Sequence, residues 1–170
     1  MNPDIFIDDF ELTENTEELH AILGRCLVIS TRFDNLCDAV AKFLKLKTVS
    51  PTLLSKDEYN DFITSMYEKF STLNNNINSL PIEQDVKDIL HIAREARNNV
   101  AHSLSIDMVG CLDIKMDENI FKSQVSSLVM EIGAGDYLIS ALLSLLNKEP
   151  LPNYTENDYK RKVIKWVLGD

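Results

Sequence analysis

The sequence is poor in the residues that interrupt helices, with only 5 glycines and 5 prolines among 170 residues. Strand-like alternation of apolar and polar residues is also scarce, whereas apolar residues recur at spacings of three and four along most of the chain. This pattern predicts an all-α protein. The length suits a single compact domain, covering residues 1–170, with a core of its own.

Cysteines are few as well. Cys26, Cys37 and Cys111 form an odd number without a Cys-x-x-Cys pair, which argues against both a disulfide framework and a zinc knuckle. His20 and His91 have no metal-ligand spacing to each other or to a cysteine. We therefore expect a cytoplasmic protein without a metal site.

A long hydrophobic run and a targeting segment are missing too. No basic and apolar N-terminal stretch precedes a small-residue cleavage site. The longest apolar patch, Tyr137 to Leu146, contains two serines and is too short to span a bilayer. We expect a protein that is neither secreted nor embedded in a membrane.

Basic residues are fewer than acidic ones, 17 against 27, and the formal net charge is −10. This balance argues against a broad phosphate-binding surface, although it leaves room for a small basic site. The charge is unevenly spread: residues 1–14 form an acidic segment without a base, whereas Lys160, Arg161, Lys162 and Lys165 cluster near the end. Both runs are typical of solvated faces.

Apolar stripes at helical spacing predict four long helices and a short last one, each opened or closed by capping residues or prolines. They cover residues 15–50, 55–77, 81–104, 117–146 and 154–168. Pro81 suits the first turn of the third helix. Together these elements predict an antiparallel helical bundle with an appended C-terminal helix.

The sequence leaves the structure of two segments open and makes one further prediction for the last helix. Gly133-Ala-Gly135 can kink the fourth helix, split it, or let another helix approach closely. The segment Met108 to Met116 is compatible with either a loop or a brief extended piece. In the last helix, Tyr159, Val163 and Trp166 are expected to dock while the basic residues face outward.

The stretch REARNNVAHSL, Arg94 to Leu104, raises a question about its arginine. On an ideal helix Arg97 falls near the centre of an apolar face formed by Val86, Ile89, Leu90, Ala93, Ala96, Val100 and Leu104. An arginine aimed at a core needs a partner or a cleft. His102 lies about 140° around the helix from Arg97, and Asn98, one turn before His102, can orient the imidazole ring.

Three arrangements could bring Arg97 and His102 to one phosphate. The arginine side chain can reach across, the helix can loosen after Ala101, or a second copy of the helix can approach across a two-fold axis. An imidazole beside a guanidinium suits metal-independent cleavage of RNA, where a base activates the 2′-hydroxyl and a cation stabilises charge on phosphorus. In the alternative interpretation, Arg97 pairs with a buried carboxylate and His102 caps or fills the helix end.

Arg97-Asn98-Asn99-Val100-Ala101-His102 resembles the Arg-x4-6-His motif of the HEPN superfamily, including the polar residue after the arginine and the small residue before the histidine. The specific part of the resemblance covers about residues 85–105. It implies a helical bundle that commonly dimerises, brings two motifs together in a cleft and often acts as an endoribonuclease without metal or cofactor. Arg97 would then hold the scissile phosphate, His102 would act as acid or base, and Asn98 would support the site.

The resemblance also implies a biological setting. Many HEPN proteins are toxins or phage-defence effectors, often paired with a separately encoded nucleotidyltransferase-type antitoxin. In this acidic chain, RNA affinity would fall to local residues, chiefly Lys87, Arg94 and Arg97, and to the basic cluster at residues 160–165.

A fainter similarity to the mannitol operon repressor family implies a non-catalytic helical module that binds a partner. An acidic partner for Arg97 from the first helix would favour this module. Two Arg97 and His102 sets lining an open dimer cleft would favour catalysis.

Overall fold

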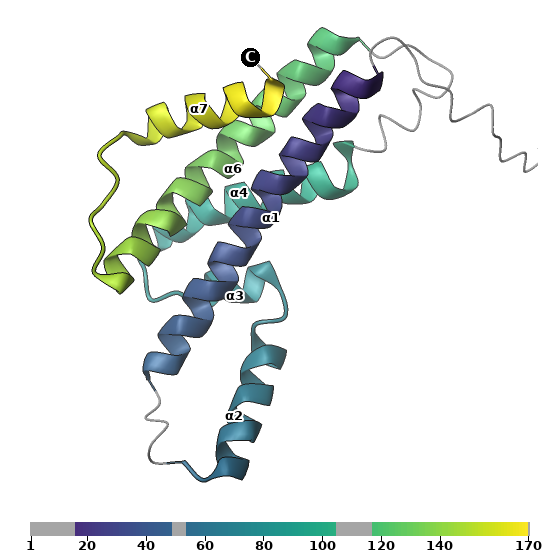
Figure 1. Cartoon of the computed structure of the whole chain (residues 1–170). Helices are drawn as coiled ribbons and strands as arrows, with labels where there is room; N and C mark the ends of the chain where they lie inside the picture. The colour runs from purple at the N-terminus through teal and green to yellow at the C-terminus, as the bar shows by residue number, and fades with distance from the viewer. Residues whose placement is uncertain (1–15, 49–53, 105–116, 170) are drawn as a thin grey trace, which may run out of the picture.

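The computed structural model describes residues 16–48, 54–104 and 117–169, which contain six helices and no strands. The helices pack as a bundle (Figure 1). They are α1 (Thr16–Lys47), α2 (Lys56–Lys69), α3 (Leu73–Ser79), α4 (Gln84–His102), α6 (Glu118–Asn147) and α7 (Glu156–Leu168). The all-α prediction is confirmed for these ranges. The segment Met108 to Met116 lies outside the described residues, as do Cys111 and residues 1–14.

The core lies where α1, α4 and α6 cross, and α7 runs back along α6 (Figure 1). Phe33, Leu90, Val129 and Ile139 are among the fully buried residues there. The predicted apolar stripes of α1, α4 and α6 supply most of this core. Ile89 is an exception, because 41% of it is exposed although it was expected on the buried face of α4.

The antiparallel arrangement was predicted for the whole bundle, but α1 and α6 run in the same direction. Near their starts Lys122 Nζ lies 2.6 Å from Glu18 Oε1, and near their ends Lys47 Nζ donates to the Leu146 carbonyl at 3.3 Å. The described helices between α1 and α6, which are α2, α3 and α4, allow this, because the chain can return to the starting end of α1 before α6 begins (Figure 1).

The second predicted helix is split into α2 and α3. The Ser55 and Glu58 capping box opens α2 as expected, but α2 ends at Lys69. Thr72 then caps α3, and its side chain accepts a hydrogen bond from the Asn75 N–H. The apolar spacing continues across residues 70–72 although the helix does not, because a threonine cap satisfies the N–H groups of a new first turn.

The third helix starts later than predicted. Its N-cap is Glu83, so Pro81 precedes the helix instead of occupying the first turn. At its other end α4 stays helical through His102, and the Ser103 N–H donates to the Asn99 carbonyl at 2.9 Å. The helix end is therefore not loosened after Ala101.

The two glycines of α6 neither kink nor split it, since it forms one helix from Glu118 to Asn147. Gly135 instead allows close approach, because a Cβ there would collide with the Ala93 side chain and lie 3.0 Å from the Phe33 ring.

Among the described helices, α6 alone is long and apolar enough to cross a membrane, a test that core helices of soluble proteins also pass. The apolar patch at residues 137–146 predicted a segment too short to span a bilayer, whereas the continuous helix that contains it is 30 residues long.

The last helix forms as predicted from its Thr155 and Asp158 capping box. Val163 and Val167 are buried in it. Trp166 does not dock as expected, because 46% of it remains exposed at the edge of a groove.

Candidate functional site

Arg97 on α4 is held by an acidic residue of the first helix. Its Nη2 donates to Asp34 Oδ2 at 2.7 Å, and its Nη1 donates to Asn98 Oδ1 at 3.3 Å. Asp34 follows the fully buried Phe33 on α1, so core packing fixes where its carboxylate lies. The side chains of Arg97 and Asp34 are each 28% exposed, which places the pair at the edge of the core and not in its centre.

Arg97 and Asn98 lie on the wall of a polar cavity of about 440 Å³. Four parts of the chain form this cavity: α1, the connection at residues 70–72, α3 and α4. The lining residues are Asp34, Asn35, Asp38, Phe70, Ser71, Thr72, Leu73, Asn74, Asn76, Arg94, Arg97 and Asn98. Two arginines and two aspartates therefore share one open space, which suits a ligand that carries both charge and hydrogen-bond donors.

Asn76 at the floor of this cavity has an unsatisfied acceptor. Only 2% of the residue is exposed, and its Nδ2 donates to Asp38 Oδ1 at 3.5 Å. Its Oδ1 has no hydrogen-bond partner among the described residues. A buried acceptor without a donor costs free energy, and because this atom is closed to solvent, a ligand in the cavity does not reach it without a rearrangement.

The predicted site residues divide between the cavity and its surroundings. Arg94, Arg97 and Asn98 line the cavity, whereas His102 and Lys87 do not. His102 is exposed at the end of α4, one turn beyond Asn98. Lys87 is half-buried and donates to the Asn78 carbonyl at 3.2 Å.

A polar stripe on α4 nevertheless connects these residues. Steps of three and four residues place side chains on one side of a helix, and this stripe consists of Lys87, His91, Arg94, Asn98 and His102. Arg97 lies beside the stripe and is turned toward α1. Because the arginine is engaged there, one copy of the chain does not bring Arg97 and His102 to the same atom.

His91 is a member of the stripe that was considered only as a metal ligand. Burial, and next the positive charge of Arg94, lower the pKa of His91 below its usual value. The imidazole is therefore neutral at pH 7, which allows Nδ1 to accept from Arg94 Nε at 3.4 Å while Nε2 donates to Asn78 Oδ1 at 3.2 Å. His91 thus helps to fix Arg94 at the cavity, and Arg94 also pairs with Glu95.

Sequence reasoning missed Asp34, Asp38 and Asn76. The two aspartates directly follow the buried residues Phe33 and Cys37. Their position beside the apolar stripe of α1 is the one feature of the sequence that could have indicated acids at the edge of the core. Nothing in the sequence indicates that α4 crosses α1 at this point. Asn76 gives no such signal, because it stands in a run of three asparagines, Asn74 to Asn76, which have low helix propensity.

An apolar face of α1 adjoins the cavity. It forms a shallow depression of about 680 Å³ lined by Leu27, Val28, Thr31, Arg32, Asn35, Leu36 and Ala39. Leu27 and Val28 are 42% and 57% exposed, and Asn35 lines both the depression and the polar cavity. A molecule covering this face would therefore also reach the mouth of the cavity.

Among the residues that the structure describes, no three His, Cys, Asp or Glu side chains are placed to hold a metal ion. The absence of a metal from the function stays a prediction.

Comparison with protein-family models, with curated proteins and with solved structures finds no match to this chain. The resemblance to the HEPN superfamily therefore rests on the motif at residues 97–102.

Proposed function

We propose that the chain is a HEPN-type, metal-independent endoribonuclease whose site is completed by a second copy. The observation that carries this proposal is the accessibility of the motif: Arg97 and Asn98 line an open polar cavity, and His102 is exposed one turn further along α4. A purely structural pair would call for a buried carboxylate and a histidine that caps or fills the helix end. Asp34 is not buried, and His102 lies outside the core.

Arg97 would bind the scissile phosphate without leaving Asp34. A guanidinium has five N–H donors, and Asp34 and Asn98 each accept from one of its terminal nitrogens. The remaining N–H groups can donate to phosphate oxygens and stabilise the charge that builds there. Arg94 adds a second cation on the same wall.

His102 would act as the acid or base on the 2′-hydroxyl or on the leaving 5′-oxygen. Its side chain starts about 140° around the helix from Arg97, and Arg97 is turned toward α1. The two groups of one chain therefore act on different phosphates, or a partner copy supplies one of them. The apolar α1 face, which shares Asn35 with the cavity, provides a surface on which such a copy can pack.

RNA binding in an acidic chain would depend on the cavity and not on a wide basic surface. Arg94 and Arg97 provide the cations on its wall. Affinity should then fall only modestly with salt, because few phosphates are neutralised.

The test is cleavage of total RNA and tRNA in EDTA by the purified chain, with products resolved on a denaturing gel. His102→Ala should abolish cleavage, whereas His20→Ala, which removes an exposed histidine from α1, should leave it unchanged. Products of the parent should carry 2′,3′-cyclic phosphate ends. Equal cleavage by the two variants would reject the role of His102.

The second candidate function is a non-catalytic interaction module of the mannitol-repressor-like type. The ion pair between Arg97 and Asp34 of the first helix favours it, because that is the arrangement expected when the arginine joins two helices. A folded, dimeric parent that cleaves none of the RNA substrates would make this the better account.

A further inference from the structure

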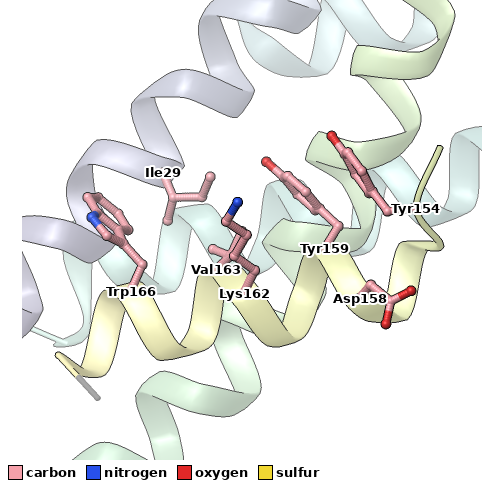
Figure 2. Close-up of a pocket in the computed structure, with 7 residues that line it drawn as sticks. All are labelled: Ile29, Tyr154, Asp158, Tyr159, Lys162, Val163 and Trp166. Carbon is pink, nitrogen blue, oxygen red and sulfur yellow. The ribbon is translucent and has the colours of Figure 1, made fainter. Parts of the chain in front are cut away.

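A groove between α1 and α7 lies outside the proposed RNA site. Its volume is about 450 Å³, within the range of about 300–1,000 Å³ that small-molecule sites occupy. Ile29 of α1 and Val163 of α7 form its floor, and both are at least nine-tenths buried. Tyr159 and Trp166 flank Val163 along α7 (Figure 2).

The aromatic side chains at one end of the groove are held in place. The Tyr159 hydroxyl donates to the buried Asp136 carboxylate, which fixes the ring. Tyr154 stacks on Tyr159, with ring centroids 6.1 Å apart and planes 12° from parallel. At the other end Trp166 is half-exposed, so one ring face is available for a ligand.

The groove carries an uncompensated positive charge. In Figure 2 the Lys162 side chain extends toward α1, with its amino group between the rings of Trp166 and Tyr159. Asp158, the acidic residue of the groove, is already engaged by the Thr155 cap and by Arg161. Within the described ranges Lys162 has no ion pair, whereas Lys160 pairs with Glu156.

We propose that this groove binds a small aromatic carboxylate or a similar aromatic anion. The ring system would lie over Ile29 and Val163, between Tyr159 and Trp166, which are seven residues and therefore about 10.5 Å apart along the helix. The anionic group would pair with Lys162. Aromatic walls and an apolar floor provide affinity for the ring, and one placed cation selects for charge.

The probes are 1-anilinonaphthalene-8-sulfonate, whose sulfonate stands in for the carboxylate, and N-phenyl-1-naphthylamine, which has the same rings without charge. Both brighten on entering an apolar site. Trp166 is the only tryptophan in the chain, so energy transfer from it reports a probe bound near α7, and the variants of the groove residues then decide whether the groove is the site. The parent should bind the sulfonate saturably, at one site, with energy transfer.

Three variants test the contacts separately. Lys162→Met should weaken binding of the sulfonate about tenfold and leave the neutral probe unchanged. Lys165→Met is the matched control, since this lysine lies on the same helix and does not line the groove. Trp166→Ala, measured by the brightening of the probes because the variant lacks the energy donor, should weaken both probes, and its half-exposed position leaves the fold intact.

Two results would overturn the proposal. If the parent bound both probes with equal affinity and Lys162→Met had no effect, the groove would not select for an anionic ligand. Lack of saturable binding with energy transfer would show that the groove is not a site. Neither result depends on whether the chain cleaves RNA.

Discussion

The Asp34 carboxylate of α1 lies 2.7 Å from the Arg97 guanidinium of α4, and the pair stands at the mouth of a polar cavity. This contact joins residues that are 63 positions apart in the sequence. The contact can have a structural role, in which it joins α1 to α4, or a functional role, in which Asp34 orients an arginine that binds phosphate. The free energy of the contact separates them.

The first prediction concerns this coupling. Asp34→Ala, Arg97→Ala and the double variant form a thermodynamic cycle, measured by urea unfolding. Because both side chains are 28% exposed, solvent screens the pair, and we expect a coupling free energy of about 1 kcal/mol or less.

A coupling free energy above about 3 kcal/mol would contradict this prediction, because it is typical of breaking a buried ion pair. It would also favour the interaction module over the ribonuclease. Arg161 and Asp158 of α7, whose side chains are 75% and 48% exposed, provide the reference cycle for an ordinary surface contact.

The second prediction uses two glycines in the middle of helices. Nothing lies within 4 Å of a Cβ built on Gly24, so Gly24→Ala should raise the free energy of unfolding by about 0.5–1 kcal/mol. A Cβ on Gly135 would collide with Ala93 and press on the Phe33 ring. Gly135→Ala should therefore lower stability by about 1–3 kcal/mol.

Thermal and urea unfolding of the two alanine variants measure these changes. Both variants replace glycine by alanine inside a helix, so the change in helix propensity is the same. If the free energy of unfolding rises in one variant and falls in the other, the difference is due to packing. A stable Gly135→Ala variant would mean that α4 and α6 do not approach as closely as described.

Local signals in the sequence predicted where α2 and α7 begin. The Ser55 and Thr155 capping boxes open α2 and α7 because each depends on residues three positions apart. The break before α3 could not be predicted in this way. Apolar spacing continues through it, and only the competing cap at Thr72 interrupts the helix.

Relationships between distant helices were less accessible. The motif at residues 97–102 includes Arg97 and Asn98, which line one wall of the cavity, but the sequence could not indicate the carboxylate that Arg97 binds. That choice depends on where α4 crosses α1, which is set by Gly135 and the parallel course of α1 and α6. The groove beside Trp166 was missed for the same reason, since helical spacing assigned that residue to the core.

The third prediction concerns the buried thiols. Burial raises the pKa of Cys26 to about 12, and burial together with Asp34 and Asp136 raises that of Cys37 as well. At pH 8 both are protonated and covered, and therefore unreactive toward a disulfide reagent such as DTNB. In a Cys111→Ser variant, the folded chain should release no thionitrobenzoate until urea unfolds it.

The rate of labelling in the absence of urea then measures opening of the core. Rapid modification of either cysteine in the folded variant would contradict the described packing of α1. The unfolded variant is the positive control, because both thiols must react once they are exposed.

The last prediction follows from Asp136, a fully buried carboxyl on α6. One of its oxygens accepts from Tyr159 and Arg32, and the other has no partner among the described residues. Burial raises the pKa of Asp136 despite the opposing effects of Tyr159 and Arg32.

The sign of the pH dependence follows from that direction. An unfolded aspartic acid has a pKa of about 3.9. Between this value and the raised pKa of Asp136, the folded chain binds more protons than the unfolded chain, so stability falls as pH rises through this window. Above the raised pKa the full penalty is present and no longer changes.

Asp136→Asn cannot ionise and so lacks this penalty. Relative to the parent, its free energy of unfolding should increase as pH rises from about 4 and then level off, as measured by urea unfolding between pH 3.5 and 7.5. Asp136→Ala, which leaves Tyr159 and Arg32 without their acceptor, should be less stable than Asp136→Asn by about 1–3 kcal/mol throughout this range, because neither variant ionises there. If the parent gained stability over Asp136→Asn with rising pH, the ion pair with Arg32 would outweigh burial and the pKa of Asp136 would be lowered.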